Sequence, residues 1–211
     1  MGSPFWHWLT RFGESGIVIP MAAVLVVFLV ASARNLRPAF VWLVPLGLAV
    51  AVTTASKIAF IGFGIGIAAI DFTGFSGHSM FAAAVYPVIA MCLLMKTRVR
   101  WQLLGVAAGY ALAVMVSVSR LEVGAHSVSE VVLGFIIGGA ASLTAIVWLD
   151  HLPRARYAGA FAVALAVWLS LAPQGPVLVQ SHDIVTTLAL RLADRATPYT
   201  RADLLSGASS M

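Results

Sequence analysis

Six apolar runs divide the chain, and each is long enough, or nearly so, to cross a lipid bilayer. A membrane-spanning helix needs about 20 residues, with a range of roughly 17–25. Because backbone groups in lipid must find their hydrogen-bond partners within the same segment, each run is predicted to form an α-helix. The runs are 16–33, 39–56, 79–95, 101–118, 127–149 and 157–172. The pattern therefore predicts an all-α polytopic membrane protein with six transmembrane helices in one bundle, the last run being the shortest.

Two shorter segments near the ends of the chain have aromatic or amphipathic character. The stretch PFWHWLTRF, residues 4–12, contains two tryptophans, and tryptophan favours the depth of the lipid headgroups. In the tail segment 181–195, Ile184, Leu188 and Leu192 share one helical face. We expect both segments to form short interfacial helices at the termini.

Composition supports a membrane protein with a single domain. The chain of 211 residues is 61% hydrophobic and 10% charged, whereas soluble domains carry about 25% charged residues. A separate soluble domain is therefore excluded, and residues 1–211 are treated as one membrane domain. The formal net charge of +5 comes from basic residues in short connectors, so it indicates topology rather than a nucleic-acid partner. The single cysteine, Cys92, excludes an intrachain disulfide and argues against a metal–thiolate site.

Basic residues gather in every second connector, and this sets the predicted orientation. The connectors 34–38, 96–100 and 150–156 hold seven Lys or Arg residues and follow the first, third and fifth runs. By the positive-inside rule, their side is cytoplasmic. The connectors 57–78 and 119–126, together with both termini, then face the periplasm of a bacterial inner membrane. This orientation counts the first run as a retained helix, although its ASA ending resembles a signal-peptide cleavage site.

The titratable groups on the predicted outer side are candidates for chemistry, because charge near hydrocarbon is costly. They are Lys57, Asp71, His78, Arg120, Glu122, His126 and Glu130, from three separate connectors. In the stretch SRLEVGAHSVSE, His126 and Glu130 are four residues apart and share a face of a helix that begins near His126. A carboxylate on one imidazole nitrogen fixes the tautomer and leaves the other nitrogen free to attack.

The stretch FSGHSM adds an anion site beside a second histidine. Ser76 and Gly77 lie where the helix of the run 79–95 begins, and helix N-termini present free N–H groups to anions. His78 follows directly, and Arg120 adds a planar fork of donors suited to phosphate. Two histidines, a basic fork and a helix start are a coherent set for phosphoryl transfer through a phosphohistidine.

These residues resemble a known family. SGH, followed 41 residues later by SR-x5-H-x3-E, is similar to the second and third signature motifs of the type-2 phosphatidic acid phosphatase superfamily. Its members include membrane lipid phosphatases and the vanadium haloperoxidases, and its pattern is K-x6-RP, then PSGH, then SR-x5-H-x3-D. The resemblance covers roughly residues 50–150, which correspond to the core helices of the six-helix membrane members.

The resemblance assigns a role to each matching residue. It implies that His126 is the nucleophile, that Glu130 orients it and that His78 is the general acid. The residues that it implies for holding the phosphate are Arg120, Ser76, Gly77 and Lys57. It also implies a lipid phosphate as the substrate and no metal or other cofactor.

Three positions depart from the family pattern. Phe75 replaces the proline of the second motif, and Glu130 is one methylene longer than the aspartate of the third. Residues 64–65 are Gly-Ile where the first motif has Arg-Pro, so one phosphate-binding arginine is missing. A lost charged hydrogen bond to phosphate costs roughly 1.5–3 kcal/mol. Arg11 or Arg191 could replace that arginine from the same side, although no motif in the sequence marks either one.

The sequence thus predicts an inner-membrane phosphatase that acts on a lipid phosphate or pyrophosphate from the periplasmic side. The alternatives are a phosphotransferase that passes the phosphoryl group to another acceptor and a non-catalytic lipid-binding relative. Haem ligation by two histidines and a transporter-like bundle are disfavoured. Lys57 fits a side chain that reaches the lipid interface nearly as well as a phosphate contact. Asp71 and Thr73 have no role that the motifs explain, and the lipid headgroup and oligomeric state have no readable signal.

Overall fold

The structure is a computed structural model that describes residues 3–149, 157–172 and 181–208. These residues form α-helices and two short 3-10 turns, with no β-strand among them beyond one isolated bridge between Ile67 and Phe72. In chain order the elements are α1 (Pro4–Thr10), η1 (Arg11–Gly13), α2 (Ser15–Ala33), α3 (Arg37–Phe63), η2 (Ala68–Ile70), α4 (Gly77–Leu94), α5 (Val99–Glu122), α6 (Val128–Leu149), α7 (Ala158–Leu171), α8 (Ser181–Leu192) and α9 (Arg201–Ala208). The all-α prediction is confirmed.

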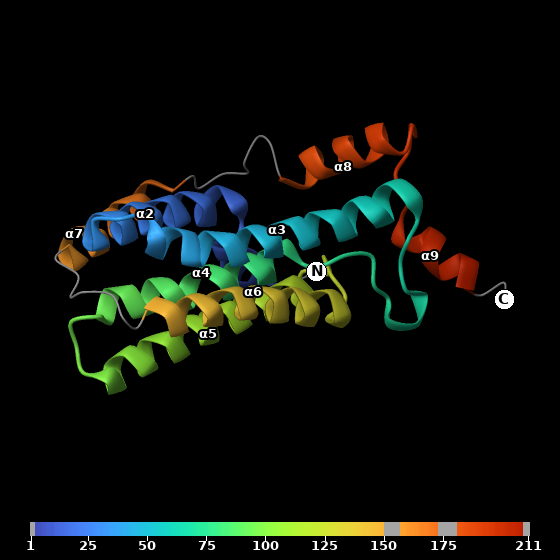
Figure 1. Cartoon of the computed structure of the whole chain (residues 1–211). Helices are drawn as coiled ribbons and strands as arrows, with labels where there is room; N and C mark the ends of the chain where they lie inside the picture. The colour runs from blue at the N-terminus through green and yellow to red at the C-terminus, as the bar shows by residue number, and fades with distance from the viewer. Residues whose placement is uncertain (1–2, 150–156, 173–180, 209–211) are drawn as a thin grey trace.

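Helix α4 is the centre of an elongated bundle (Figure 1). It contacts α2, α3, α5, α6 and α7, and it is much more buried than the other long helices. Its middle carries three fully buried alanines in a row, Ala82, Ala83 and Ala84. Since small side chains let helix backbones approach closely in a membrane, this composition explains why α4 can be surrounded on all sides.

Pairs of glycines four residues apart hold α5 and α6 against α4. On α5, a Cβ added to Gly109 would lie 2.7 Å from the Pro87 Cα atom. On α6, a Cβ at Gly134 would lie 2.6 Å from the Ser76 carbonyl oxygen, and one at Gly138 only 2.1 Å from that of Met80. These contacts leave no room for any side chain, so backbone packing sets the position of α6 relative to the start of α4.

Within the described residues, five helical stretches are long and apolar enough to cross a membrane. They are Pro4–Ala33, Arg37–Phe63, Gly77–Leu94, Val99–Glu122 and Val128–Leu149. They correspond to the first five predicted runs, but α3 and α5 extend beyond the predicted ends at 56 and 118. The prediction that Lys57, Arg120 and Glu122 lie in connectors was therefore wrong, because a helix does not stop at the first charged residue of its outer end. The connector after α5 begins at Val123.

The sixth run forms α7, a helix of 14 residues that packs against α2 and α4. Phe161 stacks on Phe28 with ring centroids 4.4 Å apart, and the Trp168 indole N–H donates to the Ile17 carbonyl at 3.1 Å. At 1.5 Å per residue α7 is about 21 Å long, less than the roughly 30 Å of a hydrocarbon core. Its assignment as a sixth transmembrane helix stays a prediction. The predicted connector 150–156 lies outside the described residues.

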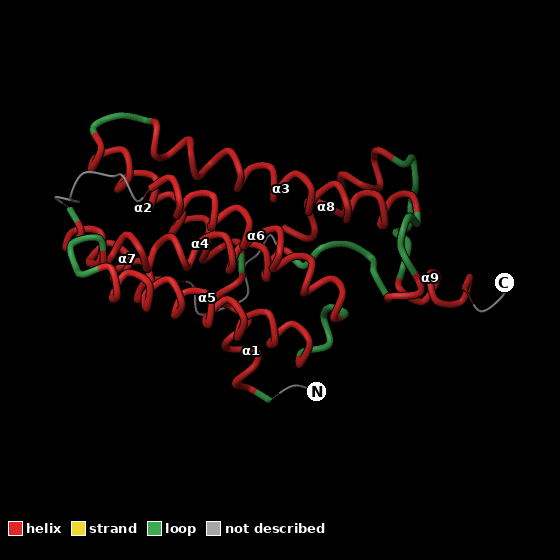
Figure 2. Tube along the Cα trace, turned by 60° about the horizontal axis from the view of Figure 1, so that its bottom comes forward, coloured by secondary structure: helices red, strands yellow, loops and turns green. Residues whose placement is uncertain are grey.

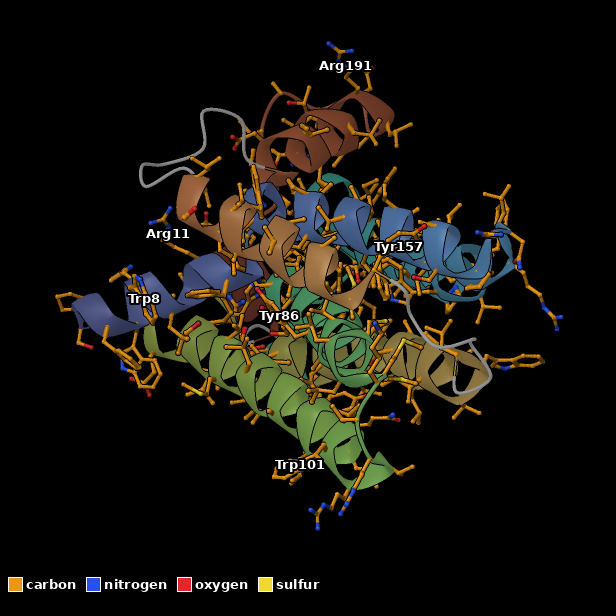
Figure 3. The ribbon with its side chains drawn as sticks, turned by 90° about the vertical axis from the view of Figure 1, so that its left-hand side faces the viewer. Trp8, Arg11, Tyr86, Trp101, Tyr157 and Arg191 are labelled. Carbon is orange, nitrogen blue, oxygen red and sulfur yellow. The ribbon has the colours of Figure 1, made fainter. Side chains whose placement is uncertain are left out.

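The C-terminal helices α8 and α9 lie at the end of the bundle where α3 finishes (Figures 1 and 2). Helix α7 and the turn between α2 and α3 lie at the opposite end of the bundle. Ala189 of α8 is fully buried against Phe60 and Ile61 of α3. The predicted apolar face of α8 is exposed, its members being Ile184, Leu188 and Leu192. At the other terminus, α1 exposes the Trp8 ring (Figure 3). Both short helices exist, and their position at the membrane interface stays a prediction.

Candidate active site

One cavity of about 640 Å³ opens at the end of the bundle where α2, α4 and α6 begin and α3 and α5 end. Six of the seven residues predicted for the site line its wall. They are Lys57, Gly77, His78, Arg120, His126 and Glu130. The seventh, Ser76, is fully buried as the N-cap residue of α4. The structure therefore brings these residues together at one end of the bundle, from four helices and one connector rather than from three connectors.

His126 and Glu130 form a hydrogen-bonded pair in the wall of the cavity. The His126 Nδ1 atom lies 2.6 Å from Glu130 Oε2, and the Glu130 side chain is fully buried. His126 precedes α6 rather than lying on it, and Ser127 caps the helix between them. The Ser127 N–H donates to Glu130 Oε2 at 3.2 Å, and the Glu130 N–H donates to Ser127 Oγ at 3.4 Å, which together form a capping box.

This contact decides which nitrogen of His126 is available. The carboxylate of Glu130 occupies Nδ1, while Nε2 has no hydrogen-bond partner within the described part of the chain and faces the cavity. Burial lowers the pKa of His126 below its ordinary value of 6.5, and the hydrogen bond and charge of Glu130 oppose that shift only in part. A lowered pKa keeps the imidazole unprotonated, which is the state in which a free nitrogen can act as a nucleophile.

The second motif is tied directly to the third. The Ser76 N–H donates to the Glu130 carbonyl oxygen at 3.0 Å, and Ser76 Oγ accepts from the Ser79 N–H at 3.4 Å. The N–H groups of Gly77 and His78 have no partner among the described residues, as is usual for the first positions of a helix. The α4 N-terminus therefore offers backbone donors to an anion in the cavity.

The N-terminal segment presses on the second histidine. A Cβ added to Gly13 of η1 would lie 2.8 Å from the Cβ and 3.0 Å from the Cδ2 of His78, so the turn fits against the ring only because residue 13 is a glycine. The His78 ring nitrogens make no hydrogen bond to any described residue, and the residue lines the cavity. No signal in the sequence marked Gly13 as a part of the site.

Two cations retain unused donors in the cavity. Arg120 Nη1 donates to Thr10 Oγ1 at 2.7 Å, whereas its Nη2 makes no hydrogen bond to a described residue. Lys57 Nζ makes no hydrogen bond or ion pair to a described residue and lies 3.8 Å from the place where a Gly77 Cβ would be. Gly74 has φ +142°, a conformation that favours glycine, and a Cβ added there would lie only 3.3 Å from the Lys57 backbone nitrogen. These donors suit an anionic group such as phosphate.

Two further residues that no motif predicted, Thr73 and Arg201, contact Glu130, and Asp71 contacts Arg201 in turn. The Thr73 N–H and Oγ1 donate to Glu130 Oε1 at 2.8 and 2.5 Å. Arg201, the first residue of α9, donates from Nη2 to both oxygens of Glu130 at 2.9 Å and from Nη1 to Asp71 Oδ2 at 2.5 Å. Asp71 and Thr73 thus belong to the site. The S-x-x-E pattern of residues 127–130 indicates the capping box formed by Ser127 and Glu130. No spacing in the sequence marks Asp71, Thr73 or Arg201.

The tail contributes a histidine and an arginine to the cavity. His182, which no motif in the sequence marks, lines the cavity, and burial lowers its pKa. Neither Arg11 nor Arg191 lies on the cavity wall. Arg191 is exposed and points away from the bundle (Figure 3), so the arginine that reaches the cavity from the tail is Arg201.

Comparison with known proteins identifies the family of this arrangement. The family model of the PAP2 superfamily matches residues 15–154, which contain the whole bundle from α2 to α6. The chain belongs to the PAP2 superfamily. Members of this superfamily are generally phosphatases, so phosphatase activity is the expectation for a PAP2 chain with this cavity.

A full-length relative has the same size but no known function. A Klebsiella pneumoniae protein described as "Uncharacterized 22.5 kDa protein in cps region" is 34% identical over 203 residues, which cover 94% of this chain and 97% of the relative. No solved structure matches the chain.

The tail lies against the position where the first PAP2 motif has an arginine. Gly64, at the arginine position of the first motif, ends α3 with φ +70°, a conformation that favours glycine. A Cβ there would lie 3.1 Å from the Tyr199 ring. The tail of this chain therefore covers the position from which the family's arginine side chain would start.

Proposed function

We propose that the chain hydrolyses a lipid phosphomonoester or pyrophosphate through a phosphohistidine on His126, at the periplasmic face of a bacterial inner membrane. One observation carries the proposal: the free Nε2 of His126 shares a cavity with a second histidine and two cations that have unused donors. PAP2 membership supports the reaction class. The distribution of basic connectors supports the orientation.

In the first step, Nε2 of His126 attacks phosphorus while the bond between phosphorus and the leaving oxygen breaks with its electron pair. His78 gives a proton to that oxygen, so the alcohol or phosphate leaves as a neutral or less charged group. Glu130, hydrogen-bonded to Nδ1, stabilises the positive charge that develops on the attacking ring. Arg120, Lys57 and the first N–H groups of α4 hold the phosphoryl oxygens, where most of the charge is distributed.

In the second step, water attacks the phosphorus of the phosphohistidine and the P–N bond breaks, which returns the electron pair to Nε2. His78, deprotonated in the first step, now takes the proton of the attacking water. Inorganic phosphate leaves and both histidines return to their starting states. No step requires a group that the chain itself does not supply.

The walls of the cavity favour a lipid over a soluble phosphate ester. Phe60, Ile61 and Phe81 line it together with the polar groups, and the long apolar helices end around it. A substrate with an apolar part next to its phosphate would bury that part against these side chains, with a gain of about 25 cal/mol per Å² of apolar surface.

The test is phosphate release by the purified protein from phosphatidic acid, phosphatidylglycerophosphate, undecaprenyl phosphate, undecaprenyl pyrophosphate and lipid A in detergent micelles. We expect turnover of at least one of them, inhibition by vanadate, and a loss of roughly 10⁴-fold or more in His126→Ala. The matched control is His7→Ala, since His7 lies exposed on α1 and should leave turnover unchanged. If no lipid is turned over faster than by His126→Ala, the protein is a non-catalytic relative and the proposal is wrong.

A further inference from the structure

Arg201 bridges two carboxylates that come from different parts of the chain. Its Nη1 donates to Asp71 in the α3–α4 connector, and its Nη2 is shared between both oxygens of Glu130 on α6. Arg201 is about one-third exposed (34%), whereas Glu130 is fully buried. The guanidinium thus joins the C-terminal tail to the carboxylate that holds the nucleophile.

The tail is docked on both sides of this arginine. Before it, the Tyr199 N–H donates to the Ile61 carbonyl at 3.0 Å, and the Tyr199 ring covers Gly64. After it, α9 contacts η2, and a Cβ at Gly66 would lie 3.0 Å from the Leu204 side chain. Arg201 therefore does not extend from a loose end but from a segment packed onto the outer end of α3.

The start of α9 is itself stabilised by a reciprocal cap. The Thr200 N–H and Oγ1 donate to Asp203 Oδ2 at 2.8 and 2.7 Å, and the Asp203 N–H donates back to Thr200 Oγ1 at 3.3 Å. These hydrogen bonds lower the pKa of Asp203, so its carboxylate stays ionised. The cap fixes the helix on which Arg201 is the first residue.

The contact with Arg201 restricts the orientation of the longer Glu130 side chain. A glutamate has one more rotatable bond than the family's aspartate, and the last torsion of such a carboxyl group has a broad energy minimum. Arg201 Nη2 lies 2.9 Å from both oxygens, so it adds a charge-assisted three-centre contact to the hydrogen bonds from Thr73 and Ser127 that also hold the plane of the carboxylate. Oε2 is the atom that faces His126 Nδ1, so the orientation of the plane decides the quality of that hydrogen bond.

We propose that Arg201 is a positioning residue, held by Asp71, that orients the Glu130 carboxylate toward Nδ1 of His126 and thereby keeps Nε2 free to attack. The proposal rests on the proposed function for its kinetic consequences, but the geometry it describes exists without substrate. It assigns to the C-terminal tail a role in catalysis that the three family motifs do not contain.

The kinetic test is a double-mutant cycle with Arg201→Ala, Glu130→Gln and the combined variant. Misplacing a reacting group by about 1 Å can cost roughly 100-fold in rate. We expect Arg201→Ala to lose kcat by that factor with KM unchanged, Arg201→Lys to recover only part of it, and the double variant to be no slower than Glu130→Gln alone. Arg191→Ala is the matched control, because Arg191 lies on the same tail, exposed and away from the cavity.

Two kinetic outcomes would overturn the proposal. A rise in KM with unchanged kcat would mean that Arg201 binds the phosphate directly. A lower melting temperature with kcat unchanged would mean that it only anchors the tail.

A second readout separates this proposal from the proposed function. The Nδ1 proton of His126 can be followed by NMR of ¹⁵N-histidine-labelled protein in detergent without any substrate, with His126→Ala giving the assignment. We expect this resonance to shift and to exchange faster with water in Arg201→Ala and not in Arg191→Ala. If it is unchanged in Arg201→Ala, the positioning role is wrong whether or not the protein is a phosphatase. If it changes while no lipid is hydrolysed, the proposed function fails and the geometry stands.

Discussion

The bundle around α4 and the tail formed by α8 and α9 both send side chains into one cavity, but different contacts hold them in place. In the bundle, glycines on α6 bring the backbone of one helix against the next with no side chain between them. In the tail, the connection to the site is a salt bridge of one arginine with two carboxylates. The difference indicates a division of labour, in which the bundle positions the reacting groups and the tail adjusts one of them.

Substitutions in the two regions should have different consequences. A close backbone contact cannot accept a new atom without moving a helix, so a change there affects the fold and the site together. A salt bridge at the cavity can be removed while the bundle persists. A change in the bundle contacts should therefore lower the stability and the activity together, whereas a change in the tail should lower the activity alone.

The largest expected effect on folding is at the contact of α6 with α4. In Gly138→Ala the new Cβ would meet the Met80 carbonyl oxygen at 2.1 Å, so the helices must separate. We expect a loss of about 3 kcal/mol in the free energy of unfolding, the upper part of the range for overpacking. The measurement is thermal unfolding in detergent, together with phosphate release.

Gly139→Ala is the neighbouring control for that change. A Cβ at Gly139 would have the Tyr110 ring at 3.9 Å as its nearest neighbour, which is ordinary contact. Equal melting temperatures for the two variants would contradict the view that backbone packing holds the core of the site.

Removing the tail should give the opposite pattern. A chain that ends after Thr197 lacks Tyr199, Arg201 and α9 but retains α8, and among the described residues the main hydrophobic core contains none beyond Ala172. We expect a melting temperature close to that of the full chain and activity lower by roughly 100-fold, because Glu130 loses its contact with Arg201. A large drop in melting temperature would show that the tail supports the bundle, and the division of labour would then be wrong.

The smallest expected effect is on the pH dependence of activity, which His126 and its partner Glu130 set. The unprotonated ring of His126 is the nucleophile, and burial lowers its pKa below 6.5, so activity should persist as the pH falls to that value and decline only at the lowered pKa. Glu130→Gln removes the charge and hydrogen bond that raise the pKa of His126. The acidic limb of kcat/KM for this weaker enzyme should therefore move to still lower pH. An acidic limb at or above 6.5 in the unmodified protein would contradict this assignment.

Sequence reasoning was most successful where the site depends on short spacings. The pair His126 and Glu130 is four residues apart, and Ser76 stands at the start of a helix, so local geometry brings these groups to one end of the bundle. The antiparallel order of the helices then places Lys57 and Arg120 at the same end. These relations follow from helix geometry and from the alternation of connectors.

The tail could not be predicted in the same way. Arg201 lies 71 residues from Glu130, and a single arginine in the tail has no pattern that marks its partner. The same holds for Gly13 against His78, because the contact depends on how η1 packs and not on a spacing. The ends of α3 and α5 were placed too early because charged residues were taken as helix limits, whereas a helix can carry them at its outer turns.

The most direct test of the central claim is to trap the phosphoenzyme. The protein is mixed with substrate that carries radiolabelled phosphate, denatured in alkali within the first turnovers and separated from lipid. A phosphohistidine survives alkali and is lost in acid, so we predict alkali-stable label on the full chain, at most one label per molecule, and none in His126→Ala. Label that remains in His126→Ala, or substrate turnover with no label on the unmodified protein, would contradict the phosphohistidine on His126.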